Sequence, residues 1–204
     1  MMKVINVCGS MIRTGTTTQC LQLCRFLSES GYRAAYAEMN RQNYIQAVHS
    51  TYRDVSFDND GKIITFSGID MIPRDMVPAV MDREEYDYLV CDYGNMNLRS
   101  FDRDLFLAGD AVIITGGVKP NEIGEFTRFL SDESMQNAIY ILSFVPKNDE
   151  AMIRELMEEK SSCTLFSPYM PDPFGNYGRL YEEGGFFYAL MDLVLYAAER
   201  KQSG

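Results

Sequence analysis

The chain has 204 residues, 46% of them hydrophobic, and a formal net charge of −10. The length and composition favour one globular domain over residues 1–204, and the acidic balance disfavours nucleic-acid binding, which needs a basic surface. No apolar run is long enough to span a membrane, so a membrane role is not expected. Five cysteines without framework spacing favour the reducing cytoplasm.

The first forty residues predict a strand, a glycine-containing loop, a helix and a second strand. Residues 3–8 form a short apolar run, and residues 17–29 carry apolar side chains at helical spacing. Gly31 stands where a C-cap glycine is expected, and residues 33–38 form the next strand. A β-α-β unit of this kind pairs its two strands in parallel.

The segment that follows predicts a short helix over 41–48 and then a hairpin. Its strands are expected at 54–57 and 63–66, around the tight-turn sequence Asn59-Asp60-Gly61. Beyond it, the chain alternates between helical periods and short, nearly continuous apolar strands. The expected strands are 88–91, 111–115, 138–144 and 163–166. The expected helices are 75–84, 100–107, 120–131, 149–160 and 179–200.

This alternation predicts an α/β fold. Apolar strands separated by helices are typical of a parallel sheet that is covered on both faces. The expected architecture is a three-layer, doubly wound, mostly parallel sheet with strand 3–8 at its centre. Ligands of such sheets bind beyond the carboxyl ends of the strands, where residues 9–18, 38–42 and 92–94 lie.

The loop of residues 9–18 partly matches the P-loop pattern G-x-x-x-x-G-K-[ST]. With Gly15 as the second glycine, Ser10 falls on the first, beside Gly9, and Thr17 falls on the hydroxyl position that binds Mg²⁺. Thr16 falls on the lysine, so the charge that contacts the β- and γ-phosphates is missing. The helix start still favours an anion. The alternative is an ordinary turn in which threonines cap the helix.

Asp92 follows an apolar strand, at the same expected edge of the sheet as the 9–18 loop. Its carboxylate is a candidate to hold a Mg²⁺ together with the hydroxyl of Thr17, mostly through water. The alternative is that Asp92 serves as a cap or turn residue after the strand.

With these residues the chain resembles the MinD/ParA group of P-loop ATPases, whose sequences open with a strand, a K-G-G-V-G-K-T-T loop and a helix. The likeness covers most of the chain in element order. It is carried by residues 15–19, by residues 86–92, which are similar to the family's Y-D-x-hydrophobic-D strand, and by residues 108–115, similar to its A-D-x-V-hydrophobic strand.

The resemblance implies ATP or ADP with Mg²⁺ as cofactors, and a homodimer or a partner protein. It places the metal at Thr17 and Asp92, and it implies that the segments after the last strands, with Pro146 and Pro171, surround the adenine. The nucleotide-binding residues would be Gly9, Ser10, Arg13, Thr14, Gly15, Thr16, Thr17, Thr18, Pro146 and Pro171.

The chain also departs from the family. The two family lysines map onto Met11 and Thr16, and an aspartate associated with hydrolysis maps onto Asn40. An amide does not orient or deprotonate water as a carboxylate does, and phosphoryl transfer needs positive charge around the phosphate. The sequence therefore predicts a nucleotide-binding switch or scaffold with weak or absent hydrolysis. The alternatives are an ATPase that uses Arg13 and Glu38 as substitutes, and an interaction module that binds no nucleotide.

Overall fold

A computed structural model describes residues 2–58 and 60–202. Its strands are β1 (Lys3–Gly9), β2 (Ala34–Glu38), β3 (Ser56–Phe57), β4 (Ile64–Phe66), β5 (Ile69–Pro73), β6 (Tyr88–Asn95), β7 (Ala111–Gly117), β8 (Ile139–Ser143) and β9 (Thr164–Ser167). In the described residues they form one sheet in the order β3-β4-β5-β2-β6-β1-β7-β8-β9. Only the β3–β4 and β4–β5 pairings are antiparallel. The predicted mostly parallel α/β sheet with strand 3–8 inside it is confirmed.

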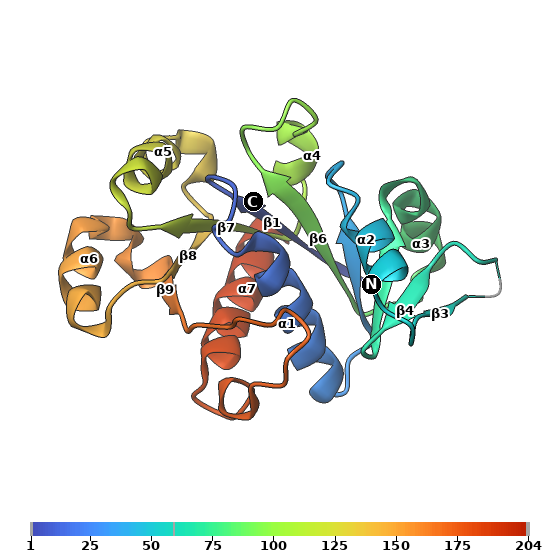
Figure 1. The fold of residues 1–204 in the computed structure, drawn as a ribbon. Helices are drawn as coiled ribbons and strands as arrows, with labels where there is room; N and C mark the ends of the chain where they lie inside the picture. Colours follow the sequence, from blue (N-terminus) through green and yellow to red (C-terminus); the bar gives the residue numbers. More distant parts are fainter. Residues whose placement is uncertain (1, 59, 203–204) are drawn as a thin grey trace.

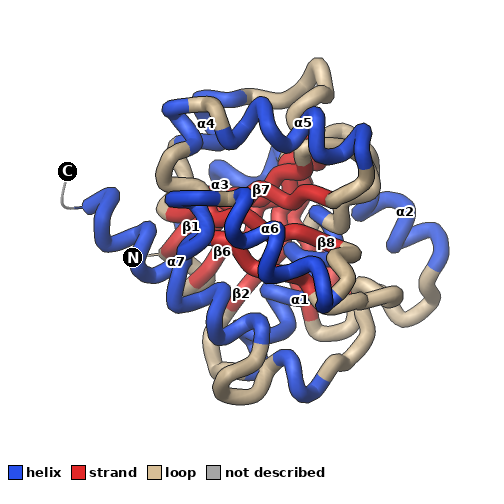
Figure 2. The backbone as a smooth tube through the Cα atoms, turned by 90° about the vertical axis from the view of Figure 1, so that its left-hand side faces the viewer, coloured by secondary structure: helices blue, strands red, loops and turns tan. Residues whose placement is uncertain are grey.

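Helices cover both faces of the sheet (Figures 1 and 2). They are α1 (Thr16–Glu29), α2 (Tyr44–Thr51), α3 (Val77–Arg83), α4 (Arg103–Leu107), α5 (Pro120–Leu130), α6 (Glu150–Leu156) and α7 (Phe186–Gln202). Apolar side chains of α1, α2 and α7 share one core, and those of α3, α4, α5 and α6 share the other. Phe26 of α1 stacks on Phe187 of α7 at 5.8 Å between ring centroids, so these two helices lie side by side (Figure 1).

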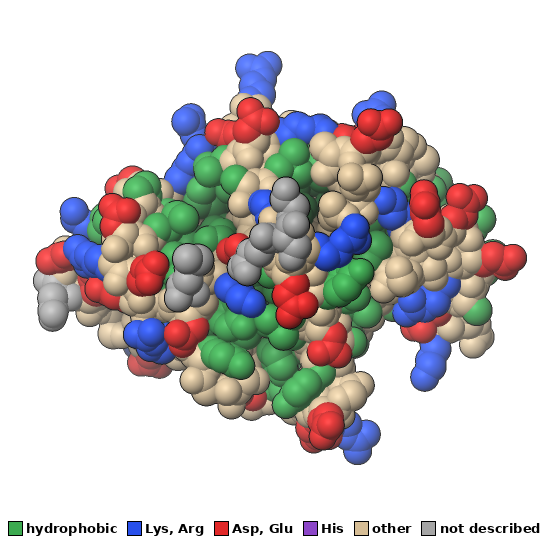
Figure 3. All heavy atoms as spheres, turned by 180° about the vertical axis from the view of Figure 1, so that it is seen from behind, with side chains coloured by type: hydrophobic (Ala, Val, Ile, Leu, Met, Phe, Trp, Pro, Cys, Tyr) green, Lys and Arg blue, Asp and Glu red, His purple; other side chains and the backbone are tan. Residues whose placement is uncertain are grey.

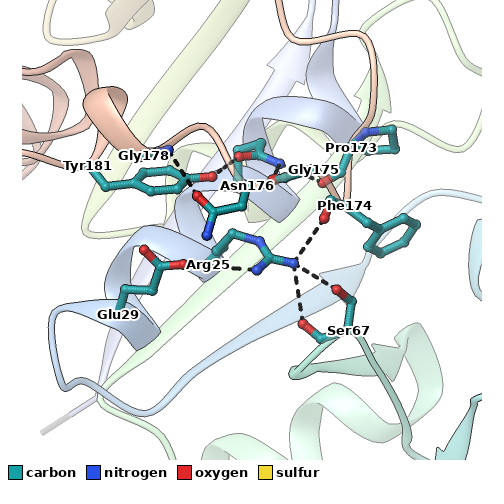
Figure 4. Close-up of polar contacts among 10 residues, drawn as sticks. Arg25, Glu29, Ser67, Pro173, Phe174, Gly175, Asn176, Gly178 and Tyr181 are labelled. Carbon is teal, nitrogen blue, oxygen red and sulfur yellow. Dashed lines mark hydrogen bonds and ion pairs between the residues drawn. The ribbon is translucent and has the colours of Figure 1, made fainter.

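The long loop between β9 and α7 is fastened to α1 by hydrogen bonds (Figure 4). Gln22 donates to the carbonyls of Pro173 and Gly175, both at 2.9 Å. The guanidinium of Arg25 donates to the carbonyl of Phe174 at 3.0 Å and to the hydroxyl of Ser67 at 2.7 Å. The helix that follows the 9–18 loop therefore holds segments from two distant parts of the chain.

Several expected helix boundaries were wrong. The helix expected over 100–107 is α4, which begins at Arg103 because Asp102 caps it. The helix expected from residue 41 begins at Tyr44, because Asn43 has a positive φ of 57°. The helix expected over 149–160 is α6, which ends at Leu156 and gives way to a 3₁₀ helix (Glu158–Cys163). The final helix begins at Phe186 and not at residue 179, because two glycines precede it and Gly184 has a φ of 80°.

The region between α2 and α3 contains one strand more than expected. The hairpin of β3 and β4 is confirmed, with Phe57 opposite Ile64. Its predicted turn includes Asn59, which lies outside the described residues. The chain then turns at residues 67–68 into β5, which pairs with β4 and, in parallel, with β2. The expected helix from residue 75 is present as α3, after a 3₁₀ turn (Arg74–Met76).

Charged side chains of both signs are spread over the face shown in Figure 3, and the basic ones do not gather into a single patch there. Among the described residues, no helix is both long enough and apolar enough to cross a membrane.

Candidate functional site

The 9–18 loop leaves the carboxyl end of β1 and leads into α1. The N–H of Ser10 donates to the carbonyl of Thr115 at 2.8 Å, and the N–H of Gln19 donates to the carbonyl of Gly15 at 2.9 Å. Between them, the N–H groups of residues 11–18 donate no hydrogen bond to the part of the chain that the structure describes. Such a run of unpaired donors at a helix start is an anion-binding arrangement.

Two glycines allow the loop to close this tightly. A Cβ at Gly9 would lie 2.6 Å from the hydroxyl oxygens of both Thr14 and Thr16. Gly15 has a φ of 90°, in the left-handed region that other residues rarely adopt. The positions of both glycines are thus fixed by backbone geometry.

The side chain at the lysine position turns toward the sheet. Thr16 is only 7% exposed, and its hydroxyl lies 2.9 Å from that of Thr115 at the end of β7. Thr115 also contacts the hydroxyl of Thr14 at 3.0 Å, which in turn donates to the carbonyl of Met11 at 3.0 Å. These threonines form a neutral chain of hydrogen bonds that holds the loop together and brings no charge to it.

Thr17 and Asp92, the predicted metal pair, contact each other directly. The Thr17 hydroxyl donates to Oδ2 of Asp92 at 2.7 Å, the Tyr36 hydroxyl donates to the same oxygen at 3.0 Å, and the N–H of Gly94 donates to Oδ1 at 2.7 Å. Burial raises the pKa of Asp92, while these hydrogen bonds act in the opposite direction. A hydroxyl and a carboxylate are oxygen ligands of the kind Mg²⁺ takes.

The described residues hold no cluster of three or more His, Cys, Asp or Glu side chains that would bind a metal ion on their own. Any ion at Thr17 and Asp92 would therefore need further oxygen ligands, which a bound phosphate and water supply in P-loop proteins.

Glu38 and Asn40, at and just beyond the end of β2, are occupied by other contacts. The carboxylate of Glu38 accepts from the N–H groups of Tyr44 at 2.5 Å and Ile45 at 3.2 Å, so it caps α2. Asn40 donates to the backbone carbonyl of Asp92 at 3.0 Å, and its Oδ1 accepts from the N–H of Gln42 at 2.9 Å. Both side chains therefore serve the backbone around the site.

A pocket of about 270 Å³ opens over the loop. Its wall includes the exposed residue Arg13, which has a positive φ of 65° and makes no hydrogen bond or ion pair with the described residues. Three predicted residues, Gly9, Ser10 and Thr14, are buried and do not line the pocket. They support the conformation of the loop from beneath it. The lining residues are Met11, Ile12, Arg13, Gly15, Thr16, Thr17, Thr18, Gln42, Gly94 and Asn95.

Gln42 and Gly94 fall in the segments 38–42 and 92–94, which were expected at the ligand-binding edge of the sheet, but neither was a predicted nucleotide contact, and Asn95 was not predicted. Their position in the sequence indicates a site, because they follow the carboxyl ends of β2 and of the apolar part of β6, where ligands of such sheets bind. Pro146 and Pro171 do not line the pocket and lie in the segments after β8 and β9.

An exposed aromatic pair accompanies these two segments. The rings of Phe144 and Tyr169 lie 6.1 Å apart, and the two side chains are 57% and 72% exposed. A larger cavity, of about 810 Å³, lies elsewhere, between α7 and the amino ends of β7 and β8. The unpaired amides and the Thr17–Asp92 pair lie at the smaller pocket, which is why we take it as the candidate site.

No family model matches the chain, and no curated protein matches it in sequence. Solved structures do match it. A plasmid partition protein from Borrelia burgdorferi B31 bound to AMPPNP has a TM-score of 0.66 and 15% identity, over 96% of this chain and 98% of that one. MinD from Pyrococcus horikoshii OT3 complexed with Mg-ADP has a TM-score of 0.57 and 16% identity, over 95% of each chain.

A third match is the pNOB8 ParA protein bound to nonspecific DNA, with a TM-score of 0.55 and 13% identity, over 100% of this chain and 99% of that one. The predicted likeness to the MinD/ParA group is confirmed at the level of the fold.

Proposed function

We propose that this chain, which has the fold of the MinD- and ParA-type proteins, binds ATP or ADP with Mg²⁺ at the 9–18 loop and hydrolyses ATP slowly or not at all. It would act in the cytoplasm as a nucleotide-dependent switch or scaffold. The observation that carries the proposal is the run of unpaired N–H groups over residues 11–18, at the start of α1. Two of the solved proteins with this fold hold AMPPNP and Mg-ADP.

Each part of the pocket has a role in this proposal. The loop amides bind the phosphates, and Thr17 with Asp92 holds Mg²⁺, which offsets phosphate charge in a protein of net charge −10. The pocket of about 270 Å³ is slightly smaller than a usual small-molecule site, so it suits the phosphate part of a nucleotide. Phe144 and Tyr169 offer the base an aromatic surface near Pro146 and Pro171.

Weak hydrolysis is expected because the side chains of Thr16 and Asn40 are already engaged in hydrogen bonds within the protein. The hydroxyl of Thr16 is hydrogen-bonded to the hydroxyl of Thr115, and both ends of the Asn40 amide are hydrogen-bonded to the backbone. Neither can supply the charge or the water-orienting carboxylate of an active ATPase. Loss of one preorganised donor to a developing negative charge costs about 10²–10³ in rate.

The alternative ATPase needs Arg13 and Glu38. Arg13 is exposed and makes no contact with the described residues that would hold it over the pocket. Glu38 caps α2 with both of its carboxylate oxygens. We therefore rank this alternative second, and the interaction module without nucleotide third. A second copy of the chain or a partner protein would bind preferentially to either the ATP-bound or the ADP-bound form.

The test is calorimetric titration with ATP and with ADP, with and without Mg²⁺. The wild type should bind both, and more tightly with the metal. Thr17→Ala should lose most of the Mg²⁺-dependent gain, about tenfold or more, because it removes a hydrogen-bonding group next to charged ligands. Thr127→Ala on α5, an exposed threonine with only a local backbone contact, is the matched control and should bind as the wild type does.

Two outcomes would count against the proposal. Absence of binding by the wild type at millimolar nucleotide would favour the interaction module. Unchanged Mg²⁺-dependent affinity in a folded Thr17→Ala variant would remove the metal from the account.

A further inference from the structure

A buried amide without a partner lies beside the 9–18 loop. Asn95, the last residue of β6, is 3% exposed. Its Oδ1 accepts from the N–H of Asn97 at 3.2 Å, but its Nδ2 is buried and has no hydrogen-bond partner among the described residues. Buried donors without an acceptor are rare because they are costly. The unpaired Nδ2 therefore indicates an acceptor that comes from outside the protein.

A β-bulge brings Asn95 to this position. Val7 of β1 pairs with Asp92, yet Gly9 pairs with Asn95, so β6 carries an extra residue in this stretch. Gly94 lies within it, with a φ of 70°. Bulges of this kind redirect side chains and are common next to ligand sites. As a result, Asn95 lies beside the first residue of the loop and lines the pocket.

We propose that Nδ2 of Asn95 donates to the outermost phosphate of a bound nucleoside triphosphate, as a neutral substitute for the missing lysine. This inference rests on the nucleotide site proposed above. In the proposed site, Thr17 and Asp92 would hold a Mg²⁺ ion, which would supply positive charge to the phosphates. Asn95 stands three residues after Asp92 in β6, and it lines the same pocket as Thr17. A triphosphate uses this donor and a diphosphate does not.

The experiment measures the affinities of AMPPNP and ADP, each with Mg²⁺, for the wild type and for three variants. Asn95→Ala should weaken AMPPNP binding about ten- to a hundredfold and ADP binding by less than about threefold, the loss expected for one hydrogen bond to a charged group. Asn95→Asp should weaken AMPPNP binding further, because it adds a like charge. Asn137→Ala, at an exposed position on the distant cavity, is the control and should change neither affinity.

Urea unfolding without ligand separates this role from a structural one. Asn95→Ala should unfold at nearly the same urea concentration as the wild type, because removal of the unpaired Nδ2 offsets the loss of the contact between Oδ1 and the N–H of Asn97. Equal losses for AMPPNP and ADP, or no loss for AMPPNP, would overturn the assignment of Asn95 while leaving the nucleotide site in place. A wild type that binds neither ligand would overturn the proposed function and this inference together.

Discussion

Thr16 shows how one side chain changes what the loop offers to a phosphate. A lysine in this place would bring a positive charge to the β- and γ-phosphates. The threonine instead contacts Thr115 and, through it, Thr14, so the loop is held closed by hydroxyls. Anion binding then depends on backbone amides, which carry only partial charges. We therefore expect the loss of the lysine to reduce the rate of hydrolysis more than the affinity.

Asp92 allows a test of the electrostatics of the site through stability. Burial raises its pKa, so folding favours the protonated form. The wild type should lose stability as the pH rises from about 4 through the raised pKa, whereas Asp92→Asn has no such group to ionise. The stability of Asp92→Asn relative to the wild type, measured by urea unfolding, should increase with pH.

Asp87→Asn is a control with the opposite sign. The guanidinium of Arg33 lowers the pKa of the exposed Asp87, so ionised Asp87 favours the folded state. The stability of Asp87→Asn relative to the wild type should fall as the pH rises. If both variants shift in the same direction, or if Asp92→Asn keeps a constant difference from the wild type, burial does not control the ionisation of Asp92.

At the scale of elements, the sequence revealed the parallel strands because they are nearly continuous apolar runs between helical periods. It did not reveal β5, which is five residues long, contains Asp70 and ends in Pro73. β5 is stabilised by pairing with β4 and β2, and these partners are not apparent from local pattern. The start predicted for the final helix, at residue 179, was wrong for a local reason, because the glycines at 184 and 185 delay α7 until Phe186.

The candidate site was predictable to a similar degree. The P-loop spacing pointed to Thr17, and the strand ending at Asp92 pointed to its partner, which the structure places at 2.7 Å. The bulge in β6 has no sequence signature beyond Gly94, so Asn95 could not be predicted. The sequence pattern also did not predict that Glu38 accepts from the N–H of Tyr44 or that Asn40 donates to the carbonyl of Asp92.

Arg25 allows a test of how α1 holds the long loop between β9 and α7 (Figure 4). Arg25→Met removes its hydrogen bonds to Phe174 and Ser67 and should lower the free energy of unfolding by about 1–3 kcal/mol. Amide hydrogen exchange in residues 172–178 should become faster, because the loop loses one of its contacts with α1.

The control is Arg128→Met on α5, which breaks an exposed pair with Glu125 and should cost less than about 1 kcal/mol. Equal effects of the two substitutions on stability and exchange would show that Arg25 does not fasten the loop.

At the scale of the whole molecule, the acidic net charge of this chain argues against DNA as a partner. The pNOB8 ParA structure contains nonspecific DNA. This chain carries 19 basic and 29 acidic side chains, and nonspecific DNA binding depends on many basic contacts. The absence of DNA binding therefore stays a prediction for this protein. We expect a second copy of the chain or a partner protein to bind one nucleotide state of this protein in preference to the other.

We propose that the 9–18 loop binds a nucleotide and hydrolyses it slowly or not at all. Phosphate release from ATP with Mg²⁺, followed for the wild type beside Arg13→Ala, tests it most directly. We expect release on the order of 10⁻³ per second or slower, with bound ATP recovered intact and no effect of Arg13→Ala. Turnover near 1 per second or faster that Arg13→Ala abolishes would contradict it, and would show that Arg13 replaces the missing lysine in an active ATPase.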